Sequence, residues 1–131
     1  MEFLLPDIID KITIVKLKIE KVGEPHLNEE LAEYEKALKE FEDKGIQIKQ
    51  EWFDELSRIN RGIWDLEYDA RVITLAEDVW EAAEKNFGFE ELGRRARLIT
   101  QFVLERSAIK NKIAEETGCG FKEIKKDYCG Q

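Results

Sequence analysis

The sequence predicts an all-α fold: a compact helical bundle of four to five helices with a long central helix. Hydrophobic residues make up 43% of the chain and charged residues 38%, a mixture typical of a folded helical domain with a charged surface. In three segments apolar residues recur at alternating spacings of three and four, which is the period of a helix. No Asn-Gly or Asp-Gly turn joins two alternating segments as in a β-hairpin. The length of 131 residues predicts one domain over 1–131, with 119–131 as a C-terminal tail.

The first helix is predicted over residues 6–22. Pro6 suits the first helical position, where its missing N–H costs no hydrogen bond. An apolar stripe follows the helix, and Ile14 and Leu17 lie on the other side, so we expect apolar neighbours on two sides. The β-branched run at 13–15 leaves a short strand as the rival interpretation.

Two further helices are predicted over residues 27–44 and 48–73, with Gly45 as a natural stop after the first. The helix over 27–44 carries a coiled-coil-like seam of Leu27, Leu31, Tyr34, Leu38 and Phe41. The helix over 48–73 carries two apolar stripes, which is typical of a central helix flanked on both sides. These stripes hold Trp52, Leu56, Ile59, Ile63, Leu66, Ala70 and Ile73 on one side and Phe53, Trp64, Tyr68 and Leu75 on the other.

The second half of the chain contains a possible helix start and a last long helix. Thr74 and Glu77 fit a capping box, which indicates a new helix ending near Asn86. One unbroken helix from residue 48 onward is the alternative. The last helix is predicted over 89–116, and its inward side is expected to hold Leu92, Ala96, Ile99, Phe102, Val103, Ile109 and Ile113.

Charge and cysteine content disfavour several classes of function. The net charge is −8, which disfavours nucleic acid and anionic membranes as partners, and only Arg94-Arg95-Ala96-Arg97 forms a basic cluster. No apolar segment near the N-terminus is long enough for a signal peptide or a membrane span, so we expect a cytoplasmic protein. Cys119 and Cys129 have no second pair to complete a zinc site and are expected as free thiols.

Acidic residues form the pattern E-E-x-x-E at 29–33 and E-x-x-D at 51–54. This pattern resembles the signature of the all-α nucleoside triphosphate pyrophosphatases of the MazG and dUTPase type. The resemblance implies Mg²⁺ held by four carboxylates on two helices, here Glu30, Glu33, Glu51 and Asp54. On a helical wheel, however, Glu29, Glu33, Glu51 and Asp54 point away from their apolar stripes. A solvated acidic face with no metal, and with Asp54 and Arg58 as an i, i+4 ion pair, is therefore preferred.

Two arginines, Arg95 and Arg106, project into the apolar sector of the last helix. An unpaired charge there is costly, so at least one is expected to contact Asp65, Glu67 or Asp69, or a bound anion. An interhelical salt bridge and a site for a small anionic ligand are both open interpretations. The candidate ligand-binding residues are Asn60, Trp64, Glu67, Arg71, Arg95 and Arg106.

Three stretches at the start, middle and end of the chain form a further pattern. They are Ile9-Asp10-Lys11-Ile12-Thr13-Ile14 followed by Lys16 and Lys18; Asn60, Ile63, Trp64, Glu67 and Arg71; and Phe89, Leu92, Ala96, Arg97, Arg106 and Lys110. Together they resemble a family of small uncharacterised helical proteins of bacterial polysaccharide-biosynthesis loci and marine phages. The resemblance implies a shared fold and no established activity. At the positions where the family often carries an Asn-Asp pair, this chain has Val103-Leu104. If that pair is catalytic in relatives, this chain lacks it.

The functional hypothesis is a helical binding or assembly protein that self-associates. Some apolar residues lie opposite the main stripes, and the interior of one bundle of this length is too small to bury them as well. They are Ile14, Leu17, Phe53, Trp64 and Tyr68. The alternatives are a Mg²⁺-dependent nucleoside triphosphate pyrophosphatase and a phosphosugar- or nucleotide-binding accessory of polysaccharide synthesis. The sequence assigns no catalytic residue, and the preferred hypothesis needs no cofactor.

Overall fold

The computed structural model describes residues 3–74 (from 68 onward the backbone alone), 81, 85 and 88–119. This part of the chain folds into four long α-helices and holds no strand: α1 (Leu5–Lys21), α2 (His26–Asp43), α3 (Gln50–Thr74) and α5 (Gly88–Thr117). The all-α prediction is confirmed, and each helix begins and ends within two residues of its expected bounds. The strand alternative at 13–15 is wrong, because these residues lie inside α1. The helix expected over 74–86 falls almost wholly outside the described residues.

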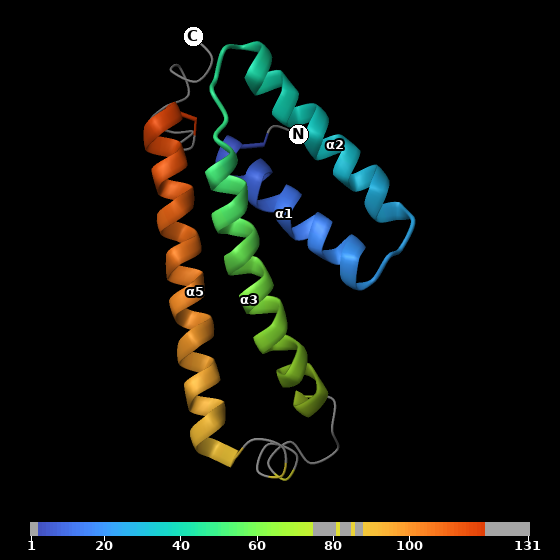
Figure 1. The fold of residues 1–131 in the computed structure, drawn as a ribbon, viewed down its shortest axis with the longest axis vertical. Coiled ribbons are helices and arrows are strands. Elements are labelled where there is room, and N and C mark those ends of the chain that lie inside the picture. Colours follow the sequence, from blue (N-terminus) through green and yellow to red (C-terminus); the bar gives the residue numbers. More distant parts are fainter. Residues whose placement is uncertain (1–2, 75–80, 82–84, 86–87, 120–131) are drawn as a thin grey trace.

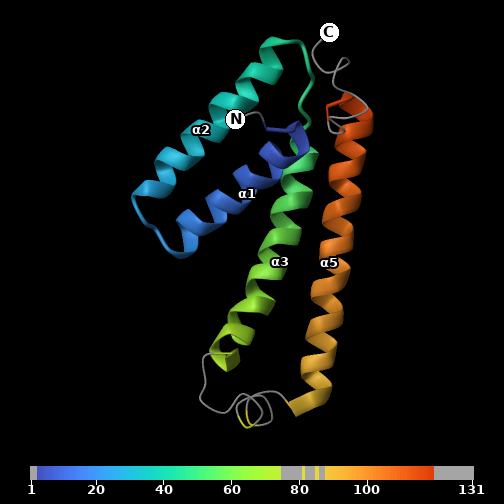
Figure 2. The ribbon, with the colours of Figure 1, turned by 180° about the vertical axis from the view of Figure 1, so that it is seen from behind.

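The helices form two antiparallel hairpins, α1 with α2 and α3 with α5 (Figure 1). Among these helices, α1 packs against all three others, α3 packs against α5, and α2 packs against α1 alone. The view from behind shows the same arrangement, with α3 between α1 and α5 (Figure 2). The shortest helix therefore joins the two hairpins.

The sequence of α1 explains why it takes this joining position. Ile8 and Ile9 are both buried, although successive positions on a helix point about 100° apart. A helix that is apolar on several sides is stable only when it has several neighbours. Gly23 ends the helix with φ 73°, and Val22, just before it, is 54% exposed. Val22, the last apolar residue of the helix predicted over 6–22, is therefore not part of the core.

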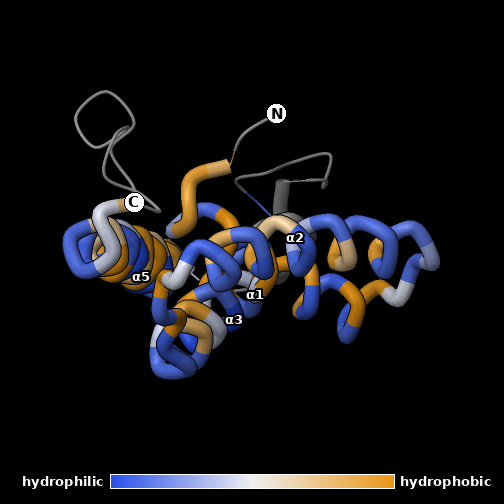
Figure 3. The backbone as a smooth tube through the Cα atoms, turned by 90° about the horizontal axis from the view of Figure 1, so that it is seen from above, coloured by the Kyte–Doolittle hydropathy of each residue, from blue (hydrophilic) through white to orange (hydrophobic). Residues whose placement is uncertain are grey.

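The main core lies where the start of α1 meets the start of α3 and the end of α5. Its buried members are Leu5, Ile9, Trp52, Leu56, Ile113 and Cys119. Seen along the long axis, every helix shows hydrophobic positions beside hydrophilic ones, as amphipathic helices must (Figure 3). The free-thiol expectation is wrong for Cys119, which is disulfide-bonded; Cys129 lies outside the described residues.

The helix α5 is buried mainly near its C-terminal end, where Ile113 and Ala114 are its buried residues. Ala96 and Val103, expected on the inward side, are exposed. The first part of α5 runs beside α3 alone among the described helices, so only one side of it is covered (Figure 1). None of the described helices combines the length and the apolar character needed to cross a membrane.

Candidate functional site

Polar side chains are buried at one place in the described structure, where α1, α3 and α5 meet. Asp10 and Thr13 of α1 and Asn60 of α3 are only 6%, 4% and 5% exposed. Asn60 Nδ2 donates to Asp10 Oδ1 at 2.8 Å and to Thr13 Oγ1 at 2.9 Å. Thr13 Oγ1 donates in turn to the backbone carbonyl of Asp10 at 2.7 Å. The amide of Asn60 thus binds two side chains of α1 at once.

Two cations from α5 complete this cluster. Arg106 Nη1 donates to Asn60 Oδ1 at 3.1 Å. Lys110 Nζ lies 2.6 Å from Asp7 Oδ1 and 3.5 Å from Asp10 Oδ2. Arg106 and Lys110 are four residues apart and so share one side of α5. We call Asp7, Asp10, Thr13, Asn60, Arg106 and Lys110 the junction cluster.

The junction cluster is balanced in charge and in hydrogen bonds. Its two carboxylates face two cations, and the buried oxygens and nitrogens of Asp10, Thr13 and Asn60 all have partners. Among the described residues, the one buried side-chain polar atom without a partner is Trp52 Nε1, outside the cluster. A fully connected network of this kind fixes how helices pack and leaves no buried group poised for acid or base chemistry.

Arg106 does not contact the expected acids, whereas contact of Arg95 with Asp69 stays a prediction, because the side chain of Asp69 lies outside the described residues. Arg106 makes a charge-assisted hydrogen bond, but to the amide of Asn60 rather than to Asp65, Glu67 or Asp69. Arg95 donates from Nε to Glu91 Oε1 at 3.1 Å, a pair within α5.

Two of the candidate ligand-binding residues, Asn60 and Arg106, are in contact. Arg95 pairs with Glu91 of its own helix. Trp64 and Glu67 are partly buried along α3, and the side chain of Arg71 lies outside the described residues.

The basic cluster at 94–97 is partly neutralised within α5. Glu91 accepts from Arg94 Nε at 2.8 Å and from Arg94 Nη2 at 2.6 Å, besides its bond from Arg95. These hydrogen bonds, first those of Arg94, lower the pKa of Glu91 to about 2. Arg94 and Arg97 are both exposed, and Arg97 is outside the pairing with Glu91.

The four carboxylates of the metal alternative do not come together. The described residues hold no group of three or more acidic, histidine or cysteine side chains that could bind a metal ion. Glu30 and Glu33 belong to α2, whereas Glu51 and Asp54 belong to α3, and these two helices do not pack against each other.

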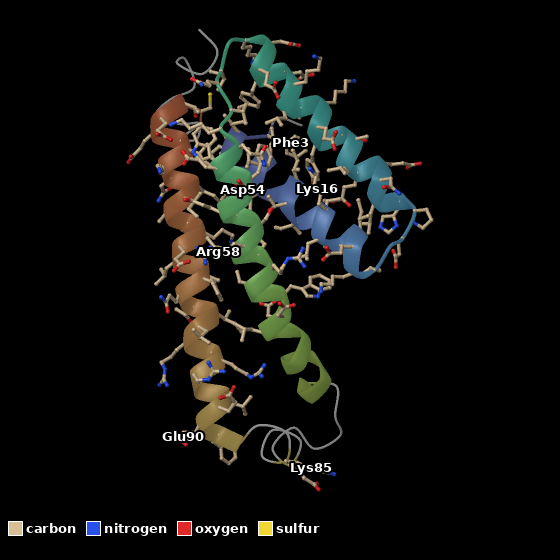
Figure 4. All side chains as sticks on the ribbon, viewed as in Figure 1. Phe3, Lys16, Asp54, Arg58, Lys85 and Glu90 are labelled. Atoms are coloured by element: carbon tan, nitrogen blue, oxygen red, sulfur yellow. The ribbon has the colours of Figure 1, made fainter. Side chains whose placement is uncertain are left out.

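The ion pair expected at Asp54 and Arg58 does not form. Asp54 Oδ1 instead accepts from Gln50 Nε2 at 3.1 Å. Arg58 lies on the side of α3 that faces α5 (Figure 4), where it pairs with Glu105 at 3.3 Å. Arg58 therefore forms an ion pair between α3 and α5 instead of one within α3.

An open groove of about 560 Å³ lies where the loop after α2 enters α3. Its apolar lining is Leu38, Ile46, Ile48 and Phe53, and its one charged lining residue is Glu42. A groove with a carboxylate and no cation does not suit an anionic ligand. The groove is thus separate from every candidate anion-binding residue.

Large apolar side chains are exposed mainly on α5. Leu104 is 66% exposed, Phe89 54% and Val103 36%, while Val22 of α1 is the fourth such residue. The surplus apolar residues expected to drive association lie elsewhere and are at least partly covered: Leu17 is buried, Ile14, Phe53 and Trp64 are half-buried, and the side chain of Tyr68 is not described. The sequence could have predicted that Leu104 is exposed, because on the helical wheel of α5 this residue lies opposite the side that holds Phe102 and Ile113.

Comparison with known proteins adds no relative to this picture. No protein-family model, no curated protein and no solved structure matches the chain.

Proposed function

We propose that this chain is a helical binding and assembly protein that self-associates. The observation that carries the proposal is the exposure of large apolar side chains on α5, where Leu104 is 66% exposed and Phe89 54% exposed. Large apolar side chains that gather on one exposed face commonly mark a protein interface.

The state of the polar groups supports the same proposal. Asp10 and Asn60 are occupied by partners within the chain, and the acidic residues of α2 and α3 stay apart. An enzyme site usually gathers titratable side chains in a concave pocket with polar groups free to meet a substrate. The described part of the chain exposes large apolar side chains on α5 and pairs its buried polar groups in the junction cluster, which suits association better.

Sedimentation velocity over micromolar to submillimolar protein concentrations tests this proposal. We expect a dimer or larger species whose fraction rises with concentration and persists in high salt, because burial of apolar surface drives it. A monomer at every concentration would contradict the proposal.

A second candidate function is the binding of a small anion such as a phosphosugar or nucleotide at Arg106. The guanidinium group has five N–H donors. Its hydrogen bond in this structure uses one of them, on an uncharged amide. Arg106 is partly buried, which strengthens a charge-assisted bond to an anion.

Thermal unfolding with inorganic phosphate, nucleotides and nucleotide sugars tests the anion candidate. We expect a ligand-dependent rise in the melting temperature that is lost in Arg106→Gln. The matched control is Arg61→Gln, because Arg61 is an exposed arginine paired with Glu20 on the surface. An equal rise in both variants would exclude Arg106 as the binding residue.

A further inference from the structure

The exposed apolar residues of α5 lie on one uncharged face. On a helix of 3.6 residues per turn, Phe89, Val103 and Leu104 fall within a sector of about 100°. The three positions that fall in this sector between Phe89 and Val103 are uncharged, although 38% of the chain is charged; they are Gly93, Ala96 and Thr100. We call these six residues the outer face of α5.

Nothing among the described helices stands in front of this face. Figure 1 places α5 at one edge of the molecule, with α1 and α2 on the far side of α3. Side chains along the outer side of α5 extend away from the other helices (Figure 4). None of the described helices therefore blocks a second helix from this face at the level of Leu104.

One flank of the outer face carries two exposed charges of opposite sign. Arg97 and Glu115 project on the same side of the face, close to 80° from Phe89 by the helical period of about 100° per residue. Both are exposed, and neither takes part in an ion pair among the described residues. The positive charge is near the start of α5 and the negative charge near its end.

The order of these charges distinguishes the two ways in which copies of α5 can pair. In an antiparallel pair the same flanks of the two helices meet, whereas in a parallel pair opposite flanks meet. The antiparallel pair therefore brings Arg97 of one copy toward Glu115 of the other, twice by symmetry. In a parallel pair Arg97 would instead meet the flank that holds Leu92 and Ile99 and faces α3.

The position of Leu104 sets the register of such a pair. Leu104 is the most exposed large apolar residue described, so burial against its symmetry mate removes the most apolar area from water. Arg97 lies seven residues before it and Glu115 eleven after it. With Leu104 on the two-fold axis, the Cα atoms of Arg97 and the partner's Glu115 are offset by about 6 Å along the helices, which these long side chains span.

We propose that a second copy of this chain packs on the outer face of α5 in an antiparallel, two-fold arrangement. Leu104 lies on the axis, and Arg97 of each copy pairs with Glu115 of the other. This inference rests on the proposed self-association and specifies its surface, its orientation and the charge pair that selects it.

Sedimentation equilibrium of four variants tests the inference. Leu104→Glu places two like charges on the axis and is expected to raise the dimer dissociation constant at least about 100-fold. Its matched control is Val22→Glu, which changes another exposed apolar residue and is expected to leave the constant unchanged. Arg97→Glu and Glu115→Arg are each expected to weaken the dimer about 10-fold, because each variant turns two symmetric attractions into repulsions.

The decisive variant combines Arg97→Glu with Glu115→Arg, since the swapped pair restores the attraction only if these residues face each other across the two-fold axis. We expect it to recover the wild-type constant within about 3-fold. A double variant weaker than both single ones overturns the antiparallel pairing. A dimer that is unaffected by Leu104→Glu overturns the proposed surface but leaves self-association standing, whereas a monomeric wild type overturns both. Circular dichroism of each variant, unchanged in helix content, separates these outcomes from misfolding.

Discussion

The two ends of the α3–α5 hairpin differ in how many neighbours they have. At the end that holds Trp52 and Ile113, α1 packs as a third helix, and both side chains are almost fully buried. At the other end the described helices offer α5 only α3, and Phe89 is 54% exposed. Both ends carry apolar residues at helical spacing. The periodicity of a helix thus reports which side is apolar, while the number of neighbours decides how much of that side is buried.

The largest expected effect compares a buried leucine with an exposed one. Leu56→Ala removes a fully buried side chain and should lower the free energy of unfolding by about 3 kcal/mol, from lost burial and the cavity left behind. Leu104→Ala should change it by less than about 0.5 kcal/mol in the monomer. Urea unfolding at matched low protein concentration measures both. Equal losses would mean that Leu104 is packed as closely as Leu56.

The next effect concerns the junction cluster. Arg106→Leu leaves the buried Asn60 Oδ1 without its donor, which should cost about 1–3 kcal/mol of unfolding free energy. Removal of a cation that pairs with a buried carboxylate would cost about 3–5 kcal/mol, so the size of the loss identifies the partner. The control is Arg61→Leu, which breaks an exposed pair with Glu20 and should cost under about 1 kcal/mol.

Two glycines inside helices give a third contrast. A Cβ atom at Gly62 would lie 2.8 Å from the ring of Phe102, whereas one at Gly93 meets no atom within 4 Å. Gly62→Ala should therefore destabilise the protein by about 1–3 kcal/mol through overpacking. Gly93→Ala should stabilise it by about 0.5–1 kcal/mol through helix propensity. Thermal unfolding of the two variants should show shifts of opposite sign, and shifts of the same sign would place Phe102 elsewhere.

The smallest effect is the response of the start of α5 to acid. Arg94, and after it Arg95, lower the pKa of Glu91 from 4.5 to about 2. A lowered pKa means that the stabilisation is present above about pH 4.5 and is lost as the pH falls toward 2. The melting temperature of the wild type should therefore fall slightly more than that of Glu91→Gln over this window. Parallel curves would show that the pair contributes nothing measurable.

The sequence predicted the helices well because their ends are local features. Pro6 lies in the first turn of α1, and Gly23, Gly45, Gly88 and Gly118 all have positive φ next to helix ends, a conformation that favours glycine. The inward side of α5 was predicted less well. Ala96 and Val103 lie at helical spacing from buried residues, but spacing carries no information about where a neighbouring helix stops.

The junction cluster shows what periodicity leaves out. Arg106 was expected to need a partner, and the structure provides one, but the partner is the amide of Asn60. The spacing of apolar residues gave no role to Asp10, although it is buried against Asn60 and Lys110. Polar residues placed among the isoleucines of α1 were the available signal. Which helix would satisfy them depended on the crossing of α1 over α3, which no local pattern encodes.

The position of α1 has a consequence for how the chain is made. During synthesis α1 leaves the ribosome before the other described helices, yet its ion pairs at Asp7 and Asp10 are with Lys110 near the end of α5. The isoleucines of α1 can be covered on one side by α2 early on, but the side that meets α3 and α5 stays open until the last helix emerges. Contacts between residues so distant along the chain form late and slow the folding of a helical protein. The nascent α1–α2 hairpin is therefore the segment that most needs protection from aggregation before translation ends.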